Sequence, residues 1–507
     1  MINKIVQLEE LRNISVKLKA EGKKIVHCHG VFDLLHPGHI KHFESAKKLG
    51  DILIVTITED KYVNKGPDRP IFNEILRAET LSAIQIINFV AINNSPLANN
   101  AIEVIKPNFY VKGPDYKKEK DDITGGITQE RKMVEQYGGK LVITDDIQFS
   151  STKIINRHFD KASDELKKFL KQTREKTSFV KIKENFETIS KMKVLVIGDI
   201  ILDEYIFVEP LGKASKSATI TAKKMSGELY AGGVLAVANH ISNFVNEVKL
   251  ITVHGNNFGN NYYDFVKSKL NKNIVFASQY VDDRPSVLKR RYVDSIFKHK
   301  LFEIIEIEDT PLPETIKKCI YSELESAHKN FDLIVVSDFG HGLIDNDIIQ
   351  CIINSDIFLS VNAQTNSANK GFNLLTKYPH CDYFSIDENE ARLATHEKYS
   401  NIEILMDNLL MKTNAKLASI TLGVKGSLVG DINKKCIAPV LSSEVLDTIG
   451  AGDAYLSITS LLAKNGNSPH EIAFVGNAVG AMAVKILGNK SYIEKIPLLK
   501  YLKTLLT

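Results

Sequence analysis

The stretch His29–His39, which reads His-Gly-Val-Phe-Asp-Leu-Leu-His-Pro-Gly-His, decides the fold of the first part of this chain. It follows a short apolar run, residues 24–28, and precedes residues 40–49, whose apolar side chains recur at the spacing of an amphipathic helix. We therefore expect a turn that leads from a buried strand into a helix. His36 and His39 lie three positions apart on the first helical turn, where free backbone N–H groups and the helix dipole favour an anion.

Two histidines in such a turn can also be metal ligands, a helix cap or core residues. A zinc site of the His-Glu-x-x-His type needs a Glu between the histidines, but Pro37 and Gly38 stand there. Phosphate contact explains the residues better, because Gly30 and Gly38 let the backbone approach a ligand closely. Imidazoles can also donate hydrogen bonds to phosphoryl oxygens as negative charge builds. The turn therefore predicts a phosphate-binding site.

The composition is that of a soluble globular protein, with 44% hydrophobic and 25% charged residues. Its 65 basic and 61 acidic residues nearly balance, which gives no case for a nucleic-acid or membrane surface. The five cysteines are far apart and lack CxxC spacing, which argues against a disulfide framework or a zinc site. No leader-like start and no apolar run of about 18 residues is seen. We expect a cytoplasmic protein.

Short apolar strands alternate with helical patterns along most of the chain, which predicts α/β folds with parallel sheets. Between about residues 156 and 191 the composition shifts to Lys, Glu, Asp and Ser. We expect two α/β domains, residues 1–157 and 191–507, joined by a charged helical linker, residues 158–190. The clearer expected strands are residues 24–28, 52–58, 89–92, 109–112 and 140–144 in the first domain, and 194–197, 250–253, 333–337, 357–361, 383–386 and 418–422 in the second.

Residues 24–157 resemble the nucleotidyltransferases that include cytidylyltransferases and the adenylyltransferase half of bifunctional heptose-phosphate enzymes. The resemblance rests on four motifs in the family's order, which are the Gly-x-Phe-Asp-x-x-His-x-Gly-His turn of Gly30–His39, the segment Lys65–Pro70 with the helix that carries Arg77, the loop Lys112–Tyr116, and Ser150–Ile155. It implies a small Rossmann-like parallel sheet. It also implies that a sugar or polyol phosphate attacks the α-phosphorus of ATP or CTP and releases pyrophosphate.

The same resemblance implies roles for individual residues. His36 and His39 contact the triphosphate and its transition state, Lys112 neutralises phosphate charge, and Asp33 braces the turn. The implied nucleotide-binding residues are Gly30, Phe32, Asp33, Asp115, Ser151 and Thr152. For Lys112 and Asp115 a solvated pair on a loop is the alternative.

A second stretch that indicates chemistry is Asp447–Asp453, which reads Asp-Thr-Ile-Gly-Ala-Gly-Asp and precedes an apolar helix at residues 454–462. Its small residues Gly450, Ala451 and Gly452 leave successive N–H groups open to a transferring phosphoryl group. Asp453 is placed to take the proton from an attacking hydroxyl. A plain helix cap is the alternative.

Residues 192–490 resemble the ribokinase-like sugar kinases in this stretch and in the order of the other motifs. The resemblance implies a larger α/β sandwich that uses ATP and Mg²⁺. The residues it implies are the sugar-contacting acids Asp199 and Asp203, the glycine pair Gly232 and Gly233 beneath the sugar, the nucleotide-side residues Thr421, Gly423 and Gly426 with Gly450, Ala451 and Gly452, and the metal-associated Glu388.

Three positions depart from that kinase family. The chain has Ala236 in place of a sugar-contacting Asn, Asn362-Ala363-Gln364 where Asp-Pro-Lys is frequent, and Ser385 at the Asn position of the metal motif. We expect an active kinase with an altered acceptor, and a degenerate, sugar-sensing or dimerising domain is the alternative. The run Lys289-Arg290-Arg291 could receive a substrate phosphate or be an exposed basic strand end.

Together the two resemblances predict a bifunctional enzyme of nucleotide-sugar synthesis for cell-surface polysaccharide. Its kinase domain phosphorylates a heptose-phosphate-like sugar, and its nucleotidyltransferase domain activates a sugar-1-phosphate. The order of the two domains is reversed relative to the heptose enzymes. We expect sugar phosphates and nucleoside triphosphates as partners, a homodimer, and no nucleic acid or membrane. The alternative is a cytidylyltransferase for a polyol or aminoalcohol phosphate.

Overall fold

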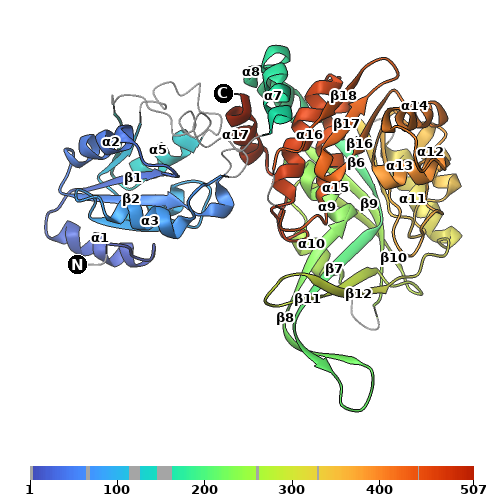
Figure 1. Cartoon of the computed structure of the whole chain (residues 1–507), viewed down its shortest axis with the longest axis horizontal. Coiled ribbons are helices and arrows are strands. Elements are labelled where there is room, and N and C mark those ends of the chain that lie inside the picture. Colours follow the sequence, from blue (N-terminus) through green and yellow to red (C-terminus); the bar gives the residue numbers. More distant parts are fainter. Residues whose placement is uncertain are drawn as a thin grey trace. The chain divides into compact units, whose positions relative to one another are not determined.

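The computed structural model describes residues 4–63, 69–113, 126–144, 163–257, 262–327, 330–442 and 445–506 (Figure 1). The chain divides into two compact units. The first unit holds residues 1–163 and 496–505, and the second holds residues 164–495. Each unit is α/β, as the alternation of patterns predicts.

The first unit is built on a five-stranded parallel sheet of order β3-β2-β1-β4-β5. Its strands are β1 (Ile25–Gly30), β2 (Ile52–Thr58), β3 (Phe89–Asn93), β4 (Phe109–Lys112) and β5 (Lys140–Ile143). Its helices are α1 (Glu10–Ala20), α2 (Pro37–Lys47), α3 (Glu74–Ser82), α4 (Asn99–Ile105) and α5 (Gly126–Gln136), with the short turn η1 (Asp60–Tyr62). Helix α17 (Lys495–Leu506) contributes most of its length to this unit.

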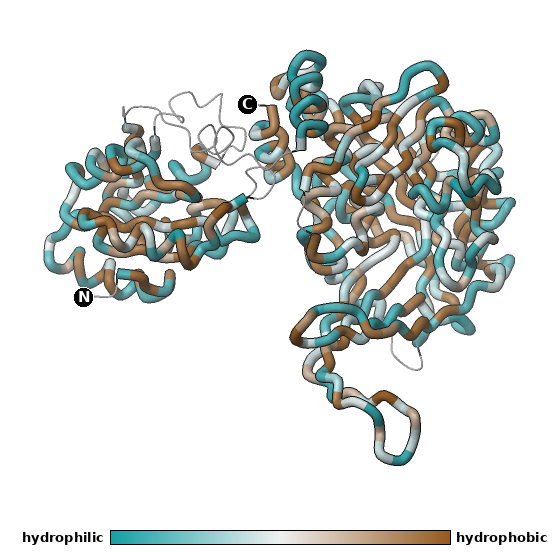
Figure 2. Tube along the Cα trace, viewed as in Figure 1, coloured by the Kyte–Doolittle hydropathy of each residue, from teal (hydrophilic) through white to brown (hydrophobic). Residues whose placement is uncertain are grey.

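Strand β1 is the central strand, and it is buried because helices cover both faces of a parallel sheet. Its side chains Val26 and Cys28 pack with Phe43 of α2 and with Val55 of β2 in one hydrophobic cluster. Figure 2 shows mostly hydrophobic residues along the strands and both hydrophilic and hydrophobic residues along the helices. The five strands expected from the sequence are thus found within two residues at each end.

The second unit contains a nine-stranded sheet of order β10-β9-β6-β13-β14-β15-β16-β17-β18, in which only the last two pairings are antiparallel. Its strands are β6 (Lys193–Gly198), β9 (Glu247–Gly255), β10 (Ile274–Val281), β13 (Leu333–Asp338), β14 (Phe358–Ala363), β15 (Tyr383–Asp387), β16 (Leu417–Thr421), β17 (Ser427–Gly430) and β18 (Lys435–Ala438). Because most pairings are parallel, the carboxyl ends of the central strands meet at one edge.

Helices cover both faces of this sheet, with α11 to α14 on one side and α9, α15 and α16 on the other (Figure 1). The helices are α7 (Asp164–Lys176), α8 (Phe179–Ile189), α9 (Val234–Ser242), α10 (Tyr263–Lys269), α11 (Glu314–Ala327), α12 (Asn346–Ile353), α13 (Glu388–Thr395), α14 (Ile402–Lys412), α15 (Ala451–Lys464) and α16 (Pro469–Ala483), with the short turns η4 (Leu375–Lys377) and η5 (Gly423–Lys425). The predicted linker, residues 158–190, is described from Ser163 onward, where it forms α7 and α8 of the second unit.

A separate four-stranded sheet, the lid sheet, has the order β12-β11-β7-β8. Its strands are β7 (Ile200–Lys213), β8 (Ile220–Gly233), β11 (Val287–Asp294) and β12 (Lys300–Glu306). Strands β7 and β8 form a long hairpin whose far end extends away from the body of the unit (Figure 1). The sequence motif Gly198–Tyr205 therefore spans two sheets, because β6 ends at Gly198 and β7 begins at Ile200.

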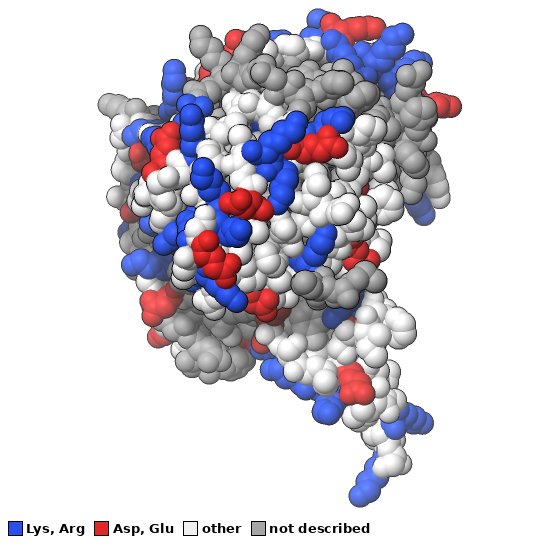
Figure 3. Space-filling view, turned by 90° about the vertical axis from the view of Figure 1, so that its left-hand side faces the viewer, with Lys and Arg blue, Asp and Glu red and all other residues white. Residues whose placement is uncertain are grey.

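Among the described residues, no helix is long and apolar enough to cross a membrane. On the face shown in Figure 3, basic and acidic side chains lie interspersed, in keeping with the nearly balanced charge of the sequence.

Candidate functional site

The first candidate site is the turn between β1 and α2. His36 is the extended N-cap residue of α2, and Pro37 occupies the first helical position. The rings of His36 and His39 are stacked, with centroids 3.9 Å apart and planes 19° from parallel. Both rings lie at the N-terminal end of α2, which carries the partial positive charge of the helix dipole.

Asp33 lies within the turn and is buried. Its Oδ1 accepts hydrogen bonds from the backbone N–H groups of Ile71 (2.8 Å) and Phe72 (3.1 Å), and its Oδ2 pairs with Nη1 of Arg69 at 3.3 Å. The carboxylate thus ties the turn to the segment before α3. All three contacts are structural, in keeping with the bracing role predicted for Asp33.

Arg77 of α3 is almost completely buried and holds the turn from the other side. Its guanidinium donates to the backbone oxygens of Val31 and Thr58 and forms an ion pair with Asp60. One side chain therefore links the turn to the end of β2.

Lys112 stands at the end of β4, where the sequence predicts a cation for phosphate. Its Nζ lies 3.1 Å from Oε2 of Glu130 of α5, and both side chains are less than 10% exposed. The other oxygen, Oε1, accepts a hydrogen bond from Ala98 N at 3.1 Å. The alternative of a solvated loop pair does not describe Lys112, because its side chain is buried. No motif in the sequence points to Glu130, since only the fold brings the two residues together.

Gly30 lies close to the ring of Phe32 in this site. A Cβ atom at Gly30 would lie 3.0 Å from the ring of Phe32, which itself has a φ of +48°. The phenyl ring packs edge-on against His39 with centroids 5.4 Å apart. Of the other predicted residues of this site, Asp115, Ser151 and Thr152 lie outside the described residues.

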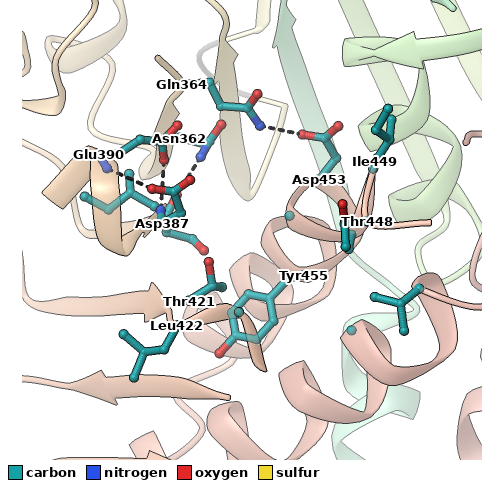
Figure 4. Close-up of a pocket in the computed structure, with 18 of the residues that line it drawn as sticks. Asn362, Gln364, Asp387, Glu390, Thr421, Leu422, Thr448, Ile449, Asp453 and Tyr455 are labelled. Carbon is teal, nitrogen blue, oxygen red and sulfur yellow. Dashed lines mark hydrogen bonds between the residues drawn. The ribbon is translucent and has the colours of Figure 1, made fainter. Parts of the chain in front are cut away.

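The second candidate site is a cavity of about 880 Å³ at the strand ends of the nine-stranded sheet (Figure 4). Ten of the residues predicted for this domain line it, which are Asp203, Gly233, Glu388, Thr421, Gly423, Gly426, Gly450, Ala451, Gly452 and Asp453. Two further predicted residues, Asp199 and Gly232, are not among the lining residues. The stretches that are far apart in the sequence thus converge on one cavity.

The N-terminus of α15 faces this cavity. Gly450 is its N-cap with a φ of +79°, and a Cβ atom there would lie 2.5 Å from Oδ1 of Asn489. Glycine alone fits such a conformation without strain. The N–H of Ala451 donates to Thr448 O at 3.3 Å, and the N–H groups of Gly452 and Asp453 follow it at the positive end of a 14-residue helix, where an anion is stabilised.

Asp453 lies in the first turn of α15 and is 7% exposed. Its Oδ1 accepts a hydrogen bond from Nε2 of Gln364 at 3.0 Å (Figure 4). Burial, together with the nearby Asp203 carboxylate, raises the pKa of Asp453 to about 7. A carboxylate with such a pKa is suited to accept a proton near neutral pH.

Asp203 points into the same cavity from the lid strand β7. Its carboxylate pairs with Arg291 of β11 and accepts a hydrogen bond from Nδ2 of Asn489 at 3.0 Å. A Cβ atom at Gly232 would lie 2.1 Å from Oδ2 of Asp203, so the glycine makes room for the carboxylate. Asn489 has no sequence motif and was missed.

Asp199 lies between the two sheets and holds the loop that follows β13. Its Oδ2 accepts hydrogen bonds from the backbone N–H groups of Phe339 (3.2 Å) and His341 (3.3 Å). Burial, followed by the nearby Asp338 carboxylate, raises the pKa of Asp199 to about 7. Its position fits a residue that supports the cavity wall.

Glu388 begins α13 and forms an ion pair with Arg392, whose Nη2 and Nε donate to Oε1 at 2.6 and 3.1 Å. Within the described part of the chain, no group of three or more His, Cys, Asp or Glu could hold a metal ion. Magnesium in phosphoryl-transfer sites is commonly held by one or two carboxylates and the substrate phosphates. Glu388 keeps Oε2 free of this ion pair and therefore fits such a role.

The basic run at Lys289 is not an exposed strand end. Arg290 pairs with Glu204 and Glu306, and the buried Arg291 pairs with Asp203 and with Glu303. Lys289 and Arg291 both line the cavity. Among the described residues, Arg291 forms ion pairs and Lys289 forms none.

Two family models match the chain. Residues 191–495 match the pfkB family carbohydrate kinases, and residues 27–157 match the cytidylyltransferase-like family. The first match covers more than half of the chain.

Curated relatives match in a short part only. "Bifunctional protein HldE" of Desulfatibacillum aliphaticivorans is 37% identical over 155 residues, which are 30% of this chain and 30% of the relative. The HldE protein of Geobacter metallireducens is 38% identical over 157 residues, 30% of this chain and 31% of the relative. The aligned part therefore spans about a third of the length of these curated relatives.

Solved structures resemble the second unit. Arabidopsis thaliana ribokinase complexed with ribose and ATP is 18% identical, with a TM-score of 0.47, and covers 62% of this chain and 99% of its own. Phosphofructokinase-2 from Escherichia coli is 13% identical, with a TM-score of 0.49, over 62% of this chain and 98% of its own. Because both TM-scores are below 0.5, these two likenesses do not strengthen the family match.

Proposed function

The chain belongs to the pfkB family of carbohydrate kinases, and we propose that it combines two transfer reactions. The second unit transfers the γ-phosphoryl group of ATP to a hydroxyl of a sugar. The first unit, which carries a cytidylyltransferase-like domain, transfers a nucleotidyl group from a nucleoside triphosphate to a sugar-1-phosphate and releases pyrophosphate. The observation that supports the kinase reaction best is the pairing of the buried Asp453 with the N-terminus of α15 in one cavity.

In the kinase reaction, Asp453 accepts the proton of the acceptor hydroxyl while the hydroxyl oxygen attacks the γ-phosphorus. The bond between that phosphorus and the bridging oxygen of ATP breaks, and ADP leaves. The N–H groups after Gly450 stabilise the charge on the transferring group, because they are preorganised at a helix N-terminus. Protein groups thus supply orientation and charge stabilisation more than covalent chemistry.

Magnesium fits this site through Glu388, because its ion pair with Arg392 uses Oε1 and leaves Oε2 outside that pair. A bound magnesium ion neutralises charge on the nucleotide phosphates. Thr421, Gly423 and Gly426 line the same cavity, and we assign them to the nucleotide.

In the nucleotidyl reaction, the two substrates are both anionic, so the site must offset their repulsion. His36 and His39 at the start of α2 donate to the triphosphate, and the helix N-terminus adds its partial positive charge. Lys112 stands at the neighbouring strand end, where its ammonium is held by Glu130. A phosphate that reaches this ammonium competes with the Glu130 carboxylate.

The acceptor we favour for the kinase is a heptose phosphate or a related sugar phosphate. The support is the resemblance of the motifs to bifunctional heptose-phosphate enzymes and the HldE relatives of the first unit. The product then feeds cell-surface polysaccharide synthesis.

The test uses the full chain in two assays. ADP release is measured with ATP, Mg²⁺ and a panel of free and phosphorylated sugars, and pyrophosphate release is measured with ATP or CTP and sugar-1-phosphates or polyol phosphates. Sugar-dependent ADP release and sugar-phosphate-dependent pyrophosphate release are expected. Pyrophosphate release with CTP and a polyol or aminoalcohol phosphate, without any sugar-dependent ADP release, would overturn the kinase assignment.

That outcome corresponds to the second candidate function, a cytidylyltransferase with a degenerate, sugar-sensing or dimerising second unit. The substitutions at Ala236, Gln364 and Ser385 favour it. The ordered cavity around Asp453 favours an active kinase instead.

A homodimer and a cytoplasmic location complete the proposal. The edge strand β12 of the lid sheet exposes Leu301, Phe302 and Ile304 by 40 to 55%, a surface suited to a second copy. All five cysteines are free, as is usual in a reducing compartment. Sedimentation equilibrium and cell fractionation test these two points.

A further inference from the structure

Gln364 directly follows strand β14 and lines the kinase cavity. Its backbone is held on both sides, because its N–H donates to Asp338 O at 2.8 Å and its carbonyl accepts from Nδ2 of Asn373 at 3.0 Å. The side chain thus projects from a fixed point. Its Nε2 lies 3.0 Å from Oδ1 of Asp453 (Figure 4).

The Asp453 carboxylate has two oxygens, and this hydrogen bond distinguishes them. Within the described residues, Oδ1 accepts from Gln364, and Oδ2 accepts from no side chain. Asp453 lines the cavity, so Oδ2 is the oxygen that remains for an acceptor hydroxyl. A single amide therefore selects which oxygen takes the proton and limits rotation of the carboxylate.

We propose that Gln364 is the positioning residue of the kinase reaction: its amide holds Oδ1 of Asp453, so that Oδ2 accepts the proton of the acceptor hydroxyl. The inference rests on the kinase function proposed above. It concerns a residue at one of the positions where the sequence departs from the kinase family.

The charged groups around Asp453 explain why a neutral amide suits this position. Asp203 on β7 and Glu390 on α13 repel its negative charge, and Lys289 on β11 attracts it. Burial and Asp203 raise the pKa of Asp453, whereas Lys289 and Gln364 lower it. A Lys in place of Gln364 would form an ion pair with Asp453 and make it a weaker base. The amide orients the carboxylate without adding a positive charge beside it.

The test compares three variants of the full chain by sugar-dependent ADP release as a function of pH. Gln364→Leu removes the donor, and Gln364→Lys replaces it with a cation. Gln350→Leu makes the same change on the exposed side of α12 and is the matched control. Because the reaction needs the ionised carboxylate, kcat rises with pH through the pKa of Asp453.

For Gln364→Leu we expect kcat to fall about 10-fold or more, while KM for ATP stays within about twofold, because only orientation is lost. The acid limb of its kcat–pH profile, where kcat rises as Asp453 ionises, should move up by about one pH unit. The reason is that the charged form of Asp453 has lost a hydrogen-bond donor. Gln364→Lys should move the acid limb down. The Gln350→Leu control should match wild type in both respects. A kcat and an acid limb of Gln364→Leu equal to those of wild type would overturn the proposal.

A readout without turnover separates this proposal from the kinase function. The thermal unfolding midpoint is followed between about pH 5 and 8 for wild type, Gln364→Leu, Asp453→Asn and the double variant Gln364→Leu/Asp453→Asn. A difference between wild type and Gln364→Leu that varies with pH, while the difference between Asp453→Asn and the double variant does not, supports the hydrogen bond, even if no sugar is phosphorylated. A difference that does not vary with pH contradicts it, even if the kinase is active.

Discussion

Replacing Glu130 by Gln removes one charge of the buried pair that holds Lys112 in the first unit. Both side chains are less than 10% exposed, and Nζ and Oε2 are 3.1 Å apart. Gln keeps the shape of the residue and an oxygen that can accept from Ala98 N. Its amide nitrogen, however, puts a donor against the ammonium.

The magnitude follows from the burial. Loss of one partner of a buried pair costs about 3 to 5 kcal/mol, and the retained contact with Ala98 places this variant near the lower value, about 3 kcal/mol. A phosphate bound at Lys112 restores a counter-charge. Glu130→Gln should therefore gain more stability than wild type from a saturating triphosphate or pyrophosphate.

The assay is thermal unfolding of the full chain with and without CTP, ATP or pyrophosphate. The matched control is Glu135→Gln, which changes an exposed carboxylate on the same helix. The control should behave as wild type in both conditions. Equal stability of Glu130→Gln and wild type without ligand, or an equal gain on adding ligand, would refute the view that Lys112 exchanges Glu130 for phosphate.

Two further predictions concern the kinase cavity. Gly232→Ala places a Cβ atom 2.1 Å from Oδ2 of Asp203, so the carboxylate must move away from Asn489. We expect the free energy of unfolding to fall by about 1.5 to 3 kcal/mol, measured by urea unfolding. We also expect a raised KM for the sugar, measured by ADP release. The raised pKa of Asp199 means that the folded state binds its proton more tightly than the unfolded chain, so its contribution is full below about pH 4 and is lost as pH rises to about 7. Asp199→Asn should therefore flatten the decline of the unfolding temperature over this range, and a decline as steep as that of wild type would contradict the assignment.

Local patterns in the sequence were enough to predict the α/β class and the two helix starts at which the candidate sites lie. The turn of His29–His39 and the start of α15 depend on short runs of glycine, proline and apolar residues, whose backbone preferences act over a few positions. The structure places both at the start of a helix, as expected: the first turn leads from β1 into α2, and the second stretch leads into α15.

Contacts across the fold could not be predicted in this way. Glu130 reaches Lys112, and Asn489 reaches Asp203, only because separate elements meet in space. The sequence also does not predict the lid sheet as a separate sheet. Only one residue lies between the end of β6 and the start of β7, so no loop marks the change from one sheet to the other. Gln364 was noticed as a departure from the kinase family, but its bond to Asp453 depends on the packing of β14 beside α15.

The most direct test of the central claim is sugar-dependent ADP release by Asp453→Asn in the full chain. Asn keeps the size of the side chain and can still accept from Gln364, but it cannot take a proton. General-base catalysis contributes about 100-fold to 10,000-fold, so we predict a fall in kcat of at least about 100-fold with ATP binding retained. An Asp453→Asn enzyme that phosphorylates the sugar at the wild-type rate would contradict the account.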